Sequence, residues 1–327
     1  MILVVGGAGY IGSHMCLRLR QQGVDHVVFD SLEKGHEKAV QGSHLHCGDL
    51  RRPQDIKSVF RSYPISAVIH FAAYIEVGES VKDPARYWEN NVVGTFNLLE
   101  AMRQAGCPRI IFSSTAAVYG EPQTPLLRED HPKNPASPYG STKLAVETML
   151  DSYDAAYDFR SVCLRYFNAS GADPRAVIGE DHRPETHLIP RVLMAAAGKA
   201  EEVAVFGQDY ATPDGTCVRD YVHVLDLAEA HWLAVQHLLD GGDSRRYNLG
   251  YGCGTSVREL IETAKKVTGR DIKVREADRR PGDPASLVAD SSAIQRDWNW
   301  QPRHAQLEEI IGDAWRWMQT HPNGYPD

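Results

Sequence analysis

The chain begins with an apolar, β-branched run that leads directly into a glycine-rich turn. The turn, GGAGYIGSH (6–14), is followed by apolar residues at helical spacing as far as about residue 22. Its glycines fit the spacing Gly-x-Gly-x-x-Gly, or Gly-x-x-Gly-x-x-Gly if the first is taken one residue earlier; they are Gly6, Gly7, Gly9 and Gly12. Glycines here allow a tight turn and let the main chain approach a pyrophosphate at the helix N-terminus. A strand, a turn and a helix in this order predict a dinucleotide-binding site.

An acidic residue closes each of the next two expected strands. Asp30 ends HVVFD (26–30), 18 residues after Gly12. A carboxylate at this place bonds the ribose 2′-hydroxyl of a dinucleotide and repels a 2′-phosphate, so NAD is favoured over NADP. Asp49, after the run 43–49, is a second candidate, for the adenine edge. A glycine-rich turn without any ligand is the alternative for this segment.

Apolar strands alternate with helical patterns through the first half of the chain. This alternation predicts an α/β fold, a Rossmann-type doubly wound parallel sheet with helices on both faces. Beyond residue 170 long loops, 171–187 and 207–220, interrupt the pattern and predict a smaller α/β substrate-binding domain. We expect an NAD-binding domain over 1–170, with a return segment near 220–239, and a second domain over 171–327. The expected strands lie at 2–7, 26–30, 43–49, 66–73, 109–115 and 161–168, and the expected helices at 11–22, 53–62, 86–105 and from Tyr139 onward.

Composition and charge exclude several classes of protein. The net charge is −8 and basic residues form no run, so we expect no nucleic-acid partner. No apolar stretch is long enough to span a membrane, and the N-terminus lacks the basic start of a signal peptide, so we expect a cytoplasmic protein. The six cysteines are scattered and are expected to be free thiols. The histidines, His44 and His46 included, show no metal-ligand spacing, and we expect no metal.

The segment SPYGSTK (137–143) places Tyr139 four residues before Lys143. On a helix these two side chains share one face, so the ammonium can lie beside the phenol. A nearby cation favours the phenolate, and a phenol tuned in this way can exchange a proton with a substrate near neutral pH. The alternative is a packed tyrosine ring beside a solvent-exposed lysine.

The chain resembles the UDP-glucose (UDP-galactose) 4-epimerase family of the extended short-chain dehydrogenase/reductase superfamily. The resemblance rests on an ordered series of segments along the full length: GGAGYIGSH, VIHFAA, VGESV, NNVVGT, FSSTAAVYGE, SPYGSTK, LRYFNASGA, DGTCVRDYVHV, YNLG and HPNGYPD. It implies an NAD-dependent isomerase that interconverts UDP-galactose and UDP-glucose. Inversion at C4 would proceed through transient hydride transfer to bound NAD and a 4-keto intermediate. It also implies a homodimer formed through the long helices near 86–105 and 139–157.

The resemblance also assigns residues. Thr115, Tyr139 and Lys143 are the implied catalytic set, with threonine where the family more often has serine. The implied cofactor contacts are Gly6, Gly9, Tyr10, Ile11, Gly12, Asp30, Ser31, Asp49, Leu50, Phe71, Ala72, Ala73, Asn90, Ser113, Tyr139, Lys143, Tyr166 and Phe167. The implied substrate contacts are Thr115, Asn168, His187, Leu188, Phe206, Arg219, Arg280, Asp283 and Leu287. Arg219 and Arg280 match diphosphate-binding arginines, and Leu287 stands at a gate beside the sugar 2-substituent.

The sequence also has to be weighed against other functions of related proteins. An intermediate side chain at Leu287 leaves UDP-N-acetylglucosamine and UDP-N-acetylgalactosamine open as substrates. A nucleotide-sugar 4,6-dehydratase needs an acid and a base directly after the threonine, where this chain has Ala116 and Ala117. A non-catalytic NAD-binding regulator on the same fold is expected to lose the Thr–Tyr–Lys set, which is present here.

Overall fold

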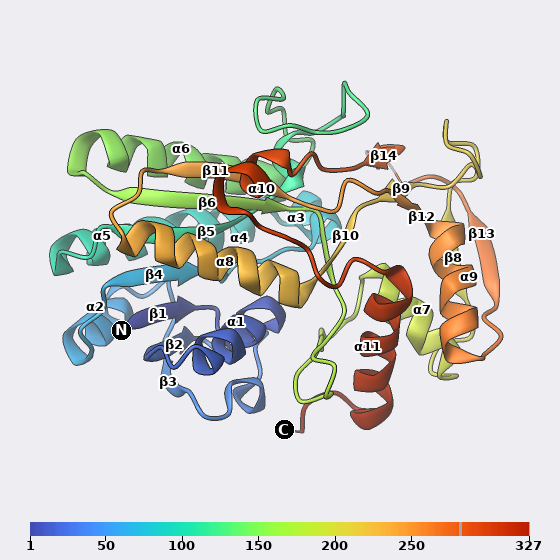
Figure 1. Cartoon of the computed structure of the whole chain (residues 1–327), viewed down its shortest axis with the longest axis horizontal. Helices are drawn as coiled ribbons and strands as arrows, with labels where there is room; N and C mark the ends of the chain where they lie inside the picture. Colours follow the sequence, from blue (N-terminus) through green and yellow to red (C-terminus); the bar gives the residue numbers. More distant parts are fainter. Residues whose placement is uncertain (281–282, 327) are drawn as a thin grey trace. The chain divides into compact units, whose positions relative to one another are not determined.

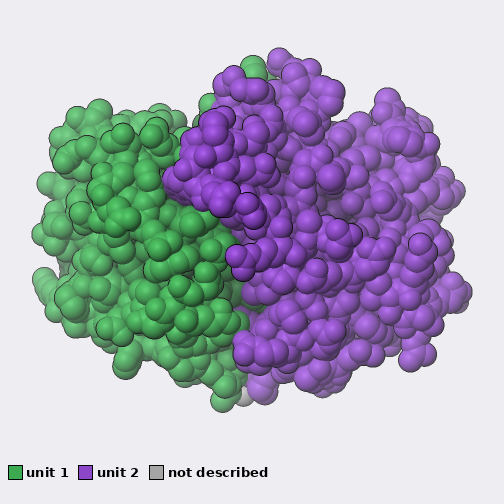
Figure 2. Space-filling model, viewed as in Figure 1, with its two compact units in different colours: residues 1–120, 132–166, 228–247 green, residues 121–131, 167–227, 248–327 purple. Residues whose placement is uncertain are grey.

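The computed structural model describes residues 1–280 and 283–326 (Figure 1). The chain folds into two compact units, coloured separately in Figure 2. Unit 1 contains residues 1–120, 132–166 and 228–247, and unit 2 contains 121–131, 167–227 and 248–327. Each unit is thus assembled from several segments, whereas the sequence predicts one boundary at residue 170 and a return near 220–239. The cofactor and substrate roles of the two parts stay predictions.

The central element of unit 1 is a seven-stranded sheet with the strand order β11-β6-β5-β4-β1-β2-β3. From β6 to β3 each strand pairs in parallel with its neighbour. The order 3-2-1-4-5-6 is that of a Rossmann fold, so the predicted fold class is confirmed. The strands are β1 (Ile2–Val5), β2 (His26–Asp30), β3 (His44–Cys47), β4 (Ala67–His70), β5 (Arg109–Thr115), β6 (Arg160–Tyr166) and β11 (Arg245–Leu249). Parallel pairing brings the carboxyl ends of β1 to β6 to one edge of the sheet.

The strands β1, β2 and β4 are buried along their whole length, which shows that both faces of this sheet are covered. Alternate β1 residues, Leu3 and Val5, share one core with apolar side chains of α2, α5 and α6. Helices α1 and α8 are joined to each other by an ion pair between Arg18 and Glu229 (2.6 Å). The helical elements that contribute to unit 1 are α1 (Tyr10–Gln21), η1 (Glu37–Val40), α2 (Pro53–Ser62), α3 (Val77–Lys82), α4 (Pro84–Tyr87), η2 (Trp88–Val93), α5 (Gly94–Ala105), η3 (Ala116–Val118), α6 (Pro138–Tyr157) and α8 (Val224–Leu239), the last of which begins in unit 2.

The helix expected over 86–105 is not a single α-helix. Residues 84–87 are α-helical, η2 is a π-helical stretch, and α5 continues to Ala105. The wider turn contains Asn91, a buried amide whose Nδ2 donates to Tyr74 O (3.0 Å) and to Thr142 Oγ1 of α6 (3.2 Å). Hydrophobic periodicity does not reveal this change, because a short π-helical stretch shifts the main-chain bonding by one residue over too few residues to alter the apolar spacing of the whole segment.

Unit 2 is built from small sheets packed with helices. The pairs β7–β10 and β8–β13 are parallel, and β9 lies between β12 and β14. Helices α7, α9 and α11 share an apolar core with β8. Its elements are β7 (Asn168–Ser170), α7 (Leu188–Ala196), β8 (Val203–Phe206), β9 (Val218–Arg219), β10 (Tyr221–His223), β12 (Thr255–Ser256), α9 (Val257–Thr268), β13 (Val274–Ala277), β14 (Ser286–Leu287), α10 (Ser292–Trp298) and α11 (Leu307–Thr320).

Two further predictions concern the cysteines and the membrane. All six cysteines lie in the described part of the chain and are free, as expected. Within residues 1–280 and 283–326, no helix has the length and apolar character needed to cross a membrane.

Candidate active site

The glycine turn lies between β1 and α1 at the carboxyl edge of the sheet. Gly6 has φ +78°, a left-handed conformation that favours glycine, and a Cβ there would lie 2.4 Å from Ala72 N. A Cβ on Gly12 would lie 2.2 Å from Gly6 O. Helix α1 starts after Gly9 without a side-chain cap. A close main-chain turn and a helix N-terminus without a side-chain cap fit the pyrophosphate of a dinucleotide.

Asp30 ends β2 beside this turn. Its Oδ2 accepts a hydrogen bond from Ala8 N and its Oδ1 accepts one from Leu32 N, each at 2.9 Å. Burial raises the pKa of Asp30, and these main-chain donors oppose that rise. The carboxylate is therefore held next to the turn, where an adenosine ribose is expected. Asp49 is different, because Arg51 forks onto it at 2.7–3.0 Å; an adenine contact by Asp49 stays a prediction.

Most other predicted cofactor contacts follow strands of the same sheet. Phe71 N and Ala72 N both donate to Val5 O, at 2.8 and 3.2 Å, which fixes the segment after β4 beside the end of β1. Tyr166 ends β6, and its hydroxyl donates to Ser113 Oγ on β5. Ser31, Leu50, Ala73 and Asn90 lie after β2, after β3, after β4 and in η2. Phe167, which follows β6, is the first residue of a segment of unit 2.

The catalytic set predicted from the sequence comes together in unit 1. Thr115 is the last residue of β5, and its hydroxyl lies close enough to the phenol of Tyr139 to lower the pKa of that phenol. Helix α6 starts one residue before Tyr139, because Ser137 Oγ caps Gly140 N (3.2 Å) and Pro138 occupies the first helical position. Lys143 is buried one turn further along. A strand end and a helix start thus hold a hydroxyl, a phenol and an amine at one place.

The environment changes the acidity of the phenol and the amine in a direction that the sequence did not predict. Desolvation raises the pKa of Tyr139 to about 12; its hydrogen bond to Thr115 opposes this rise and the Glu76 carboxylate adds to it. Burial lowers the pKa of Lys143 to about 7. The expected lowering of the Tyr139 pKa by Lys143 is therefore wrong for the chain alone. The physical reason is that desolvation disfavours the charged form of both groups.

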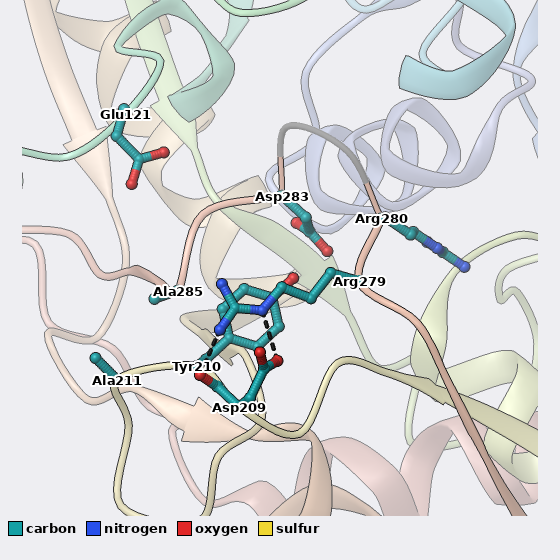
Figure 3. A pocket seen from close by; sticks show the side chains of 8 residues that line it. All are labelled: Glu121, Asp209, Tyr210, Ala211, Arg279, Arg280, Asp283 and Ala285. Atoms are coloured by element: carbon teal, nitrogen blue, oxygen red, sulfur yellow. Dashed lines mark hydrogen bonds and ion pairs between the residues drawn. The ribbon is translucent and has the colours of Figure 1, made fainter.

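Unit 2 contains a cleft of about 590 Å³ (Figure 3). This size is within the range of small-molecule sites, about 300–1,000 Å³. Arg279 stacks on Tyr210, 4.1 Å from the ring centre, and bonds Asp209 Oδ1 at 2.6 Å. The cleft is lined by Glu121, Asp209, Tyr210, Ala211, Arg279, Arg280, Asp283 and Ala285.

Several predicted substrate contacts lie in or near this cleft. Arg280 stacks on Phe206, 3.9 Å from the ring centre. Arg219 pairs with Asp283, so the predicted diphosphate arginine and the predicted ribose acid are partners in this structure. Leu287 of β14 pairs in register with Arg219 of β9. Phe206, Arg219 and Leu287 thus converge on one region of unit 2.

The remaining predicted substrate contacts of unit 2 are Asn168, Leu188 and His187, and the structure places them around β7 and the start of α7. Asn168 N donates to Asp220 O (3.0 Å) at the start of β7. Leu188 is the first residue of α7. His187 Nδ1 faces two carboxylates, Glu180 at 2.9 Å and Glu185 at 3.0 Å. A sugar-nucleotide contact by His187 stays a prediction.

Sequence reasoning missed several residues of these sites. The carboxylate of Glu76 raises the pKa of the Tyr139 phenol. Asp209, Tyr210 and Arg279 line the cleft of unit 2. The length of the loop 207–220 was a usable signal, but Asp209 and Tyr210 lie outside the motif that begins at Asp214. Their proximity to Arg280 arises only when β8 and β13 pair.

Comparisons with known proteins agree on one group of enzymes. The NAD dependent epimerase/dehydratase family model matches residues 2–250. A UDP-glucose 4-epimerase of Halalkalibacterium halodurans is 52% identical over 324 residues, covering 99% of this chain and 97% of the relative. A crystal structure of UDP-glucose 4-epimerase has a TM-score of 0.98 at 49% identity and covers 100% of this chain and 99% of its own. The Brucella ovis UDP-glucose 4-epimerase, solved with NAD, has a TM-score of 0.94 at 48% identity, with coverage of 96% and 97%.

Proposed function

The chain belongs to the NAD dependent epimerase/dehydratase family, and we propose that it interconverts UDP-galactose and UDP-glucose by inverting the configuration at sugar C4. The observation that carries this proposal is near-full-length similarity to UDP-glucose 4-epimerases together with an intact Thr115–Tyr139–Lys143 set. Relatives named for UDP-glucose favour the plain hexose over N-acetylated sugars as the main substrate.

The side chains of the protein transfer the proton of the sugar 4-hydroxyl and hold the cofactor in place. The Tyr139 phenolate, beside the Thr115 hydroxyl, takes the proton from the sugar 4-hydroxyl and later returns it. Thr115 can donate to the sugar oxygen or accept from it. The glycine turn and Asp30 would hold NAD, which when bound supplies hydride transfer at C4 and a positive charge beside the phenol. That charge opposes the desolvation that keeps Tyr139 neutral.

The residues after Thr115 separate an epimerase from a dehydratase of the same family. Elimination of a hydroxyl needs an acid at the leaving oxygen and a base at the neighbouring carbon. Ala116 and Ala117 occupy these places, in the short helix η3. Neither can transfer a proton, so the chain keeps the steps that oxidise and reduce C4 and lacks those that eliminate water.

We propose that side chains of unit 2 bind the UDP part of the substrate. Arg219 and Arg280 can each present a guanidinium fork to a diphosphate, and Phe206 offers a ring face for uracil. Arg219 would exchange its present partner, Asp283, for phosphate, while Asp283 would turn to the nucleotide ribose. Strong contacts to the nucleotide leave the sugar free to present either face.

We also propose that the chain forms a homodimer and that the helical segments η2–α5 and α6 form the interface. Trp88, Val93 and Phe96 are 42%, 49% and 47% exposed on η2 and α5. Several exposed apolar side chains on one helical segment favour a protein partner, and a second copy offers the same face. Phe96→Asp is expected to shift the molar mass measured by light scattering from dimer to monomer, whereas Val177→Asp, at a 55% exposed site in unit 2, leaves it unchanged.

The test of function is turnover of UDP-galactose by purified protein, with UDP-glucose followed by chromatography. Tyr139→Phe is expected to lower kcat by about 10²–10⁴-fold. Tyr157→Phe, at an exposed tyrosine on the same helix, is the matched control and should keep full activity. Absence of product from the wild-type protein, even with added NAD, would overturn the epimerase assignment.

A further inference from the structure

Four ionisable side chains converge in the loop that precedes α7, within unit 2. They come from a segment with no helix or strand, between the end of β7 and Leu188. One nitrogen or oxygen of each lies within 4.8 Å of the corresponding atoms of the others. The four residues are Glu180, His182, Glu185 and His187. His187 is also a predicted substrate contact, but the proposed proton transfer and that contact do not explain why a second histidine and two glutamates meet it here.

The distances within this His₂Glu₂ cluster are those of a small coordination polyhedron. Nδ1 of His187 lies 2.9 Å from Glu180 Oε1 and 3.0 Å from Glu185 Oε1. Nδ1 of His182 lies 3.1 Å from Glu180 Oε1 and 3.6 Å from Glu185 Oε2. A tetrahedral zinc ion with bonds of about 2.0–2.2 Å has ligand atoms about 3.3–3.6 Å apart. Small side-chain shifts therefore convert the cluster into a tetrahedral site.

The charges of the cluster also match a divalent ion. Both imidazoles lie within ion-pair distance of both carboxylates. One Zn²⁺ with two neutral imidazoles and two carboxylates has no net charge, so the ion leaves no unpaired charge in the cluster.

Neighbouring groups hold the ligands in place. Glu185 Oε1 accepts hydrogen bonds from the main-chain N–H groups of Thr186 and His187, both at 2.7 Å. The Glu180 carbonyl accepts one from Trp317 Nε1 of α11 (3.0 Å). The glutamate side chains are 9–10% exposed, whereas that of His187 is 40% exposed and gives an ion a path from solvent. Ligands oriented by such partners are a regular feature of metal sites.

We propose that Glu180, His182, Glu185 and His187 bind one Zn²⁺ ion in a closed, four-ligand structural site that fixes the loop before α7. Two imidazole nitrogens and two carboxylate oxygens suit zinc better than calcium or magnesium, which prefer oxygen ligands only. The spacing of the histidines in the sequence predicts no metal, and Glu-x-His-x-x-Glu-x-His is not one of the usual zinc signatures. This proposal does not depend on the epimerase activity.

The experiment is zinc titration of the full chain, stripped with a chelator, against a chromophoric competitor. Cys47 and Cys253, the exposed thiols, are replaced by serine in all proteins so that they do not bind zinc. We expect one equivalent of zinc to bind per chain. Cobalt in the same site should show the intense visible absorption of tetrahedral coordination.

Two variants locate the site. His182→Asn and Glu185→Gln are expected to weaken zinc binding about 100-fold or more and to abolish the cobalt spectrum. His304→Asn is the matched control, because His304 also pairs with a glutamate, Glu309, at 2.6 Å but belongs to no such cluster among the described residues. Absence of stoichiometric binding by the parent chain would show an ion-pair cluster only and overturn the proposal, and so would equal binding by the His182 variant. The parent titration decides even if a variant fails to fold.

Discussion

Lys143 donates a hydrogen bond from its buried amine to the main-chain oxygen of Ser113, 2.8 Å away. The same nitrogen lies 6.0 Å from the centre of the Tyr139 ring and 4.9 Å from that of Phe112. The lysine is thus attached to the end of β5 and lies beside the phenol without bonding it in this structure. Its first role is to join α6 to the sheet edge where the cofactor is expected.

Lys143→Met is expected to alter the pH dependence of stability. The folded pKa of about 7 is below the usual 10.5, so between these values the unfolded chain binds more protons than the folded one. The wild-type free energy of unfolding therefore rises with pH in this window, by about 1–2 kcal/mol from pH 7 to pH 9 relative to the variant. Urea unfolding of both proteins at several pH values measures this, and parallel profiles would contradict it.

Gly12→Ala is expected to destroy cofactor retention. The new Cβ would lie 2.2 Å from Gly6 O, so the turn must open, at a cost of about 1–3 kcal/mol in folding stability. NAD released by acid from the purified protein and the thermal midpoint are the measurements. Gly78→Ala is the control, because its Cβ meets no atom within 4 Å. Full NAD occupancy in the Gly12 variant would show that the cofactor binds elsewhere.

Thr115→Val removes the hydrogen bond that lowers the Tyr139 pKa. The phenol then loses its proton only at higher pH, so the acid limb of the kcat/KM profile should move to higher pH. Activity near neutrality is expected to fall, by about tenfold for each pKa unit that the profile moves. Thr115→Ser restores the hydroxyl and should restore the profile. An unshifted profile in the valine variant would exclude this tuning role.

Arg280→Met should weaken UDP binding more than Arg279→Met. Arg279 is already bonded to Asp209 and must leave that carboxylate before it reaches a phosphate, whereas Arg280 lies stacked on the ring of Phe206. Loss of a charged hydrogen bond of about 1.5–3 kcal/mol predicts a 10- to 100-fold higher Kd for UDP. Calorimetric titration with UDP compares the two variants. Equal losses would mean that the two arginines share the diphosphate.

The amino-acid sequence by itself determined the features that depend on local spacing. The strand, turn and helix around Gly9 follow from residues close together in the chain, and so does the start of α6 at the Ser-Pro pair before Tyr139. The parallel sheet follows from the regular alternation of strands and helices. Such features need only short-range sterics, hydrogen bonding and periodic burial.

The tertiary structure decided what depends on contacts between distant segments. The bond from Lys143 to Ser113 and the opposite pKa shifts of Tyr139 and Lys143 exist because β5 and α6 pack together and exclude water. The pairing of Arg219 with Asp283, 64 residues apart, depends on β9 lying beside β14. Even the His₂Glu₂ cluster, whose members are close in sequence, needs a specific loop path to turn all four side chains toward one another. Desolvation and side-chain direction are properties of the packed chain, so residue spacing alone does not provide them.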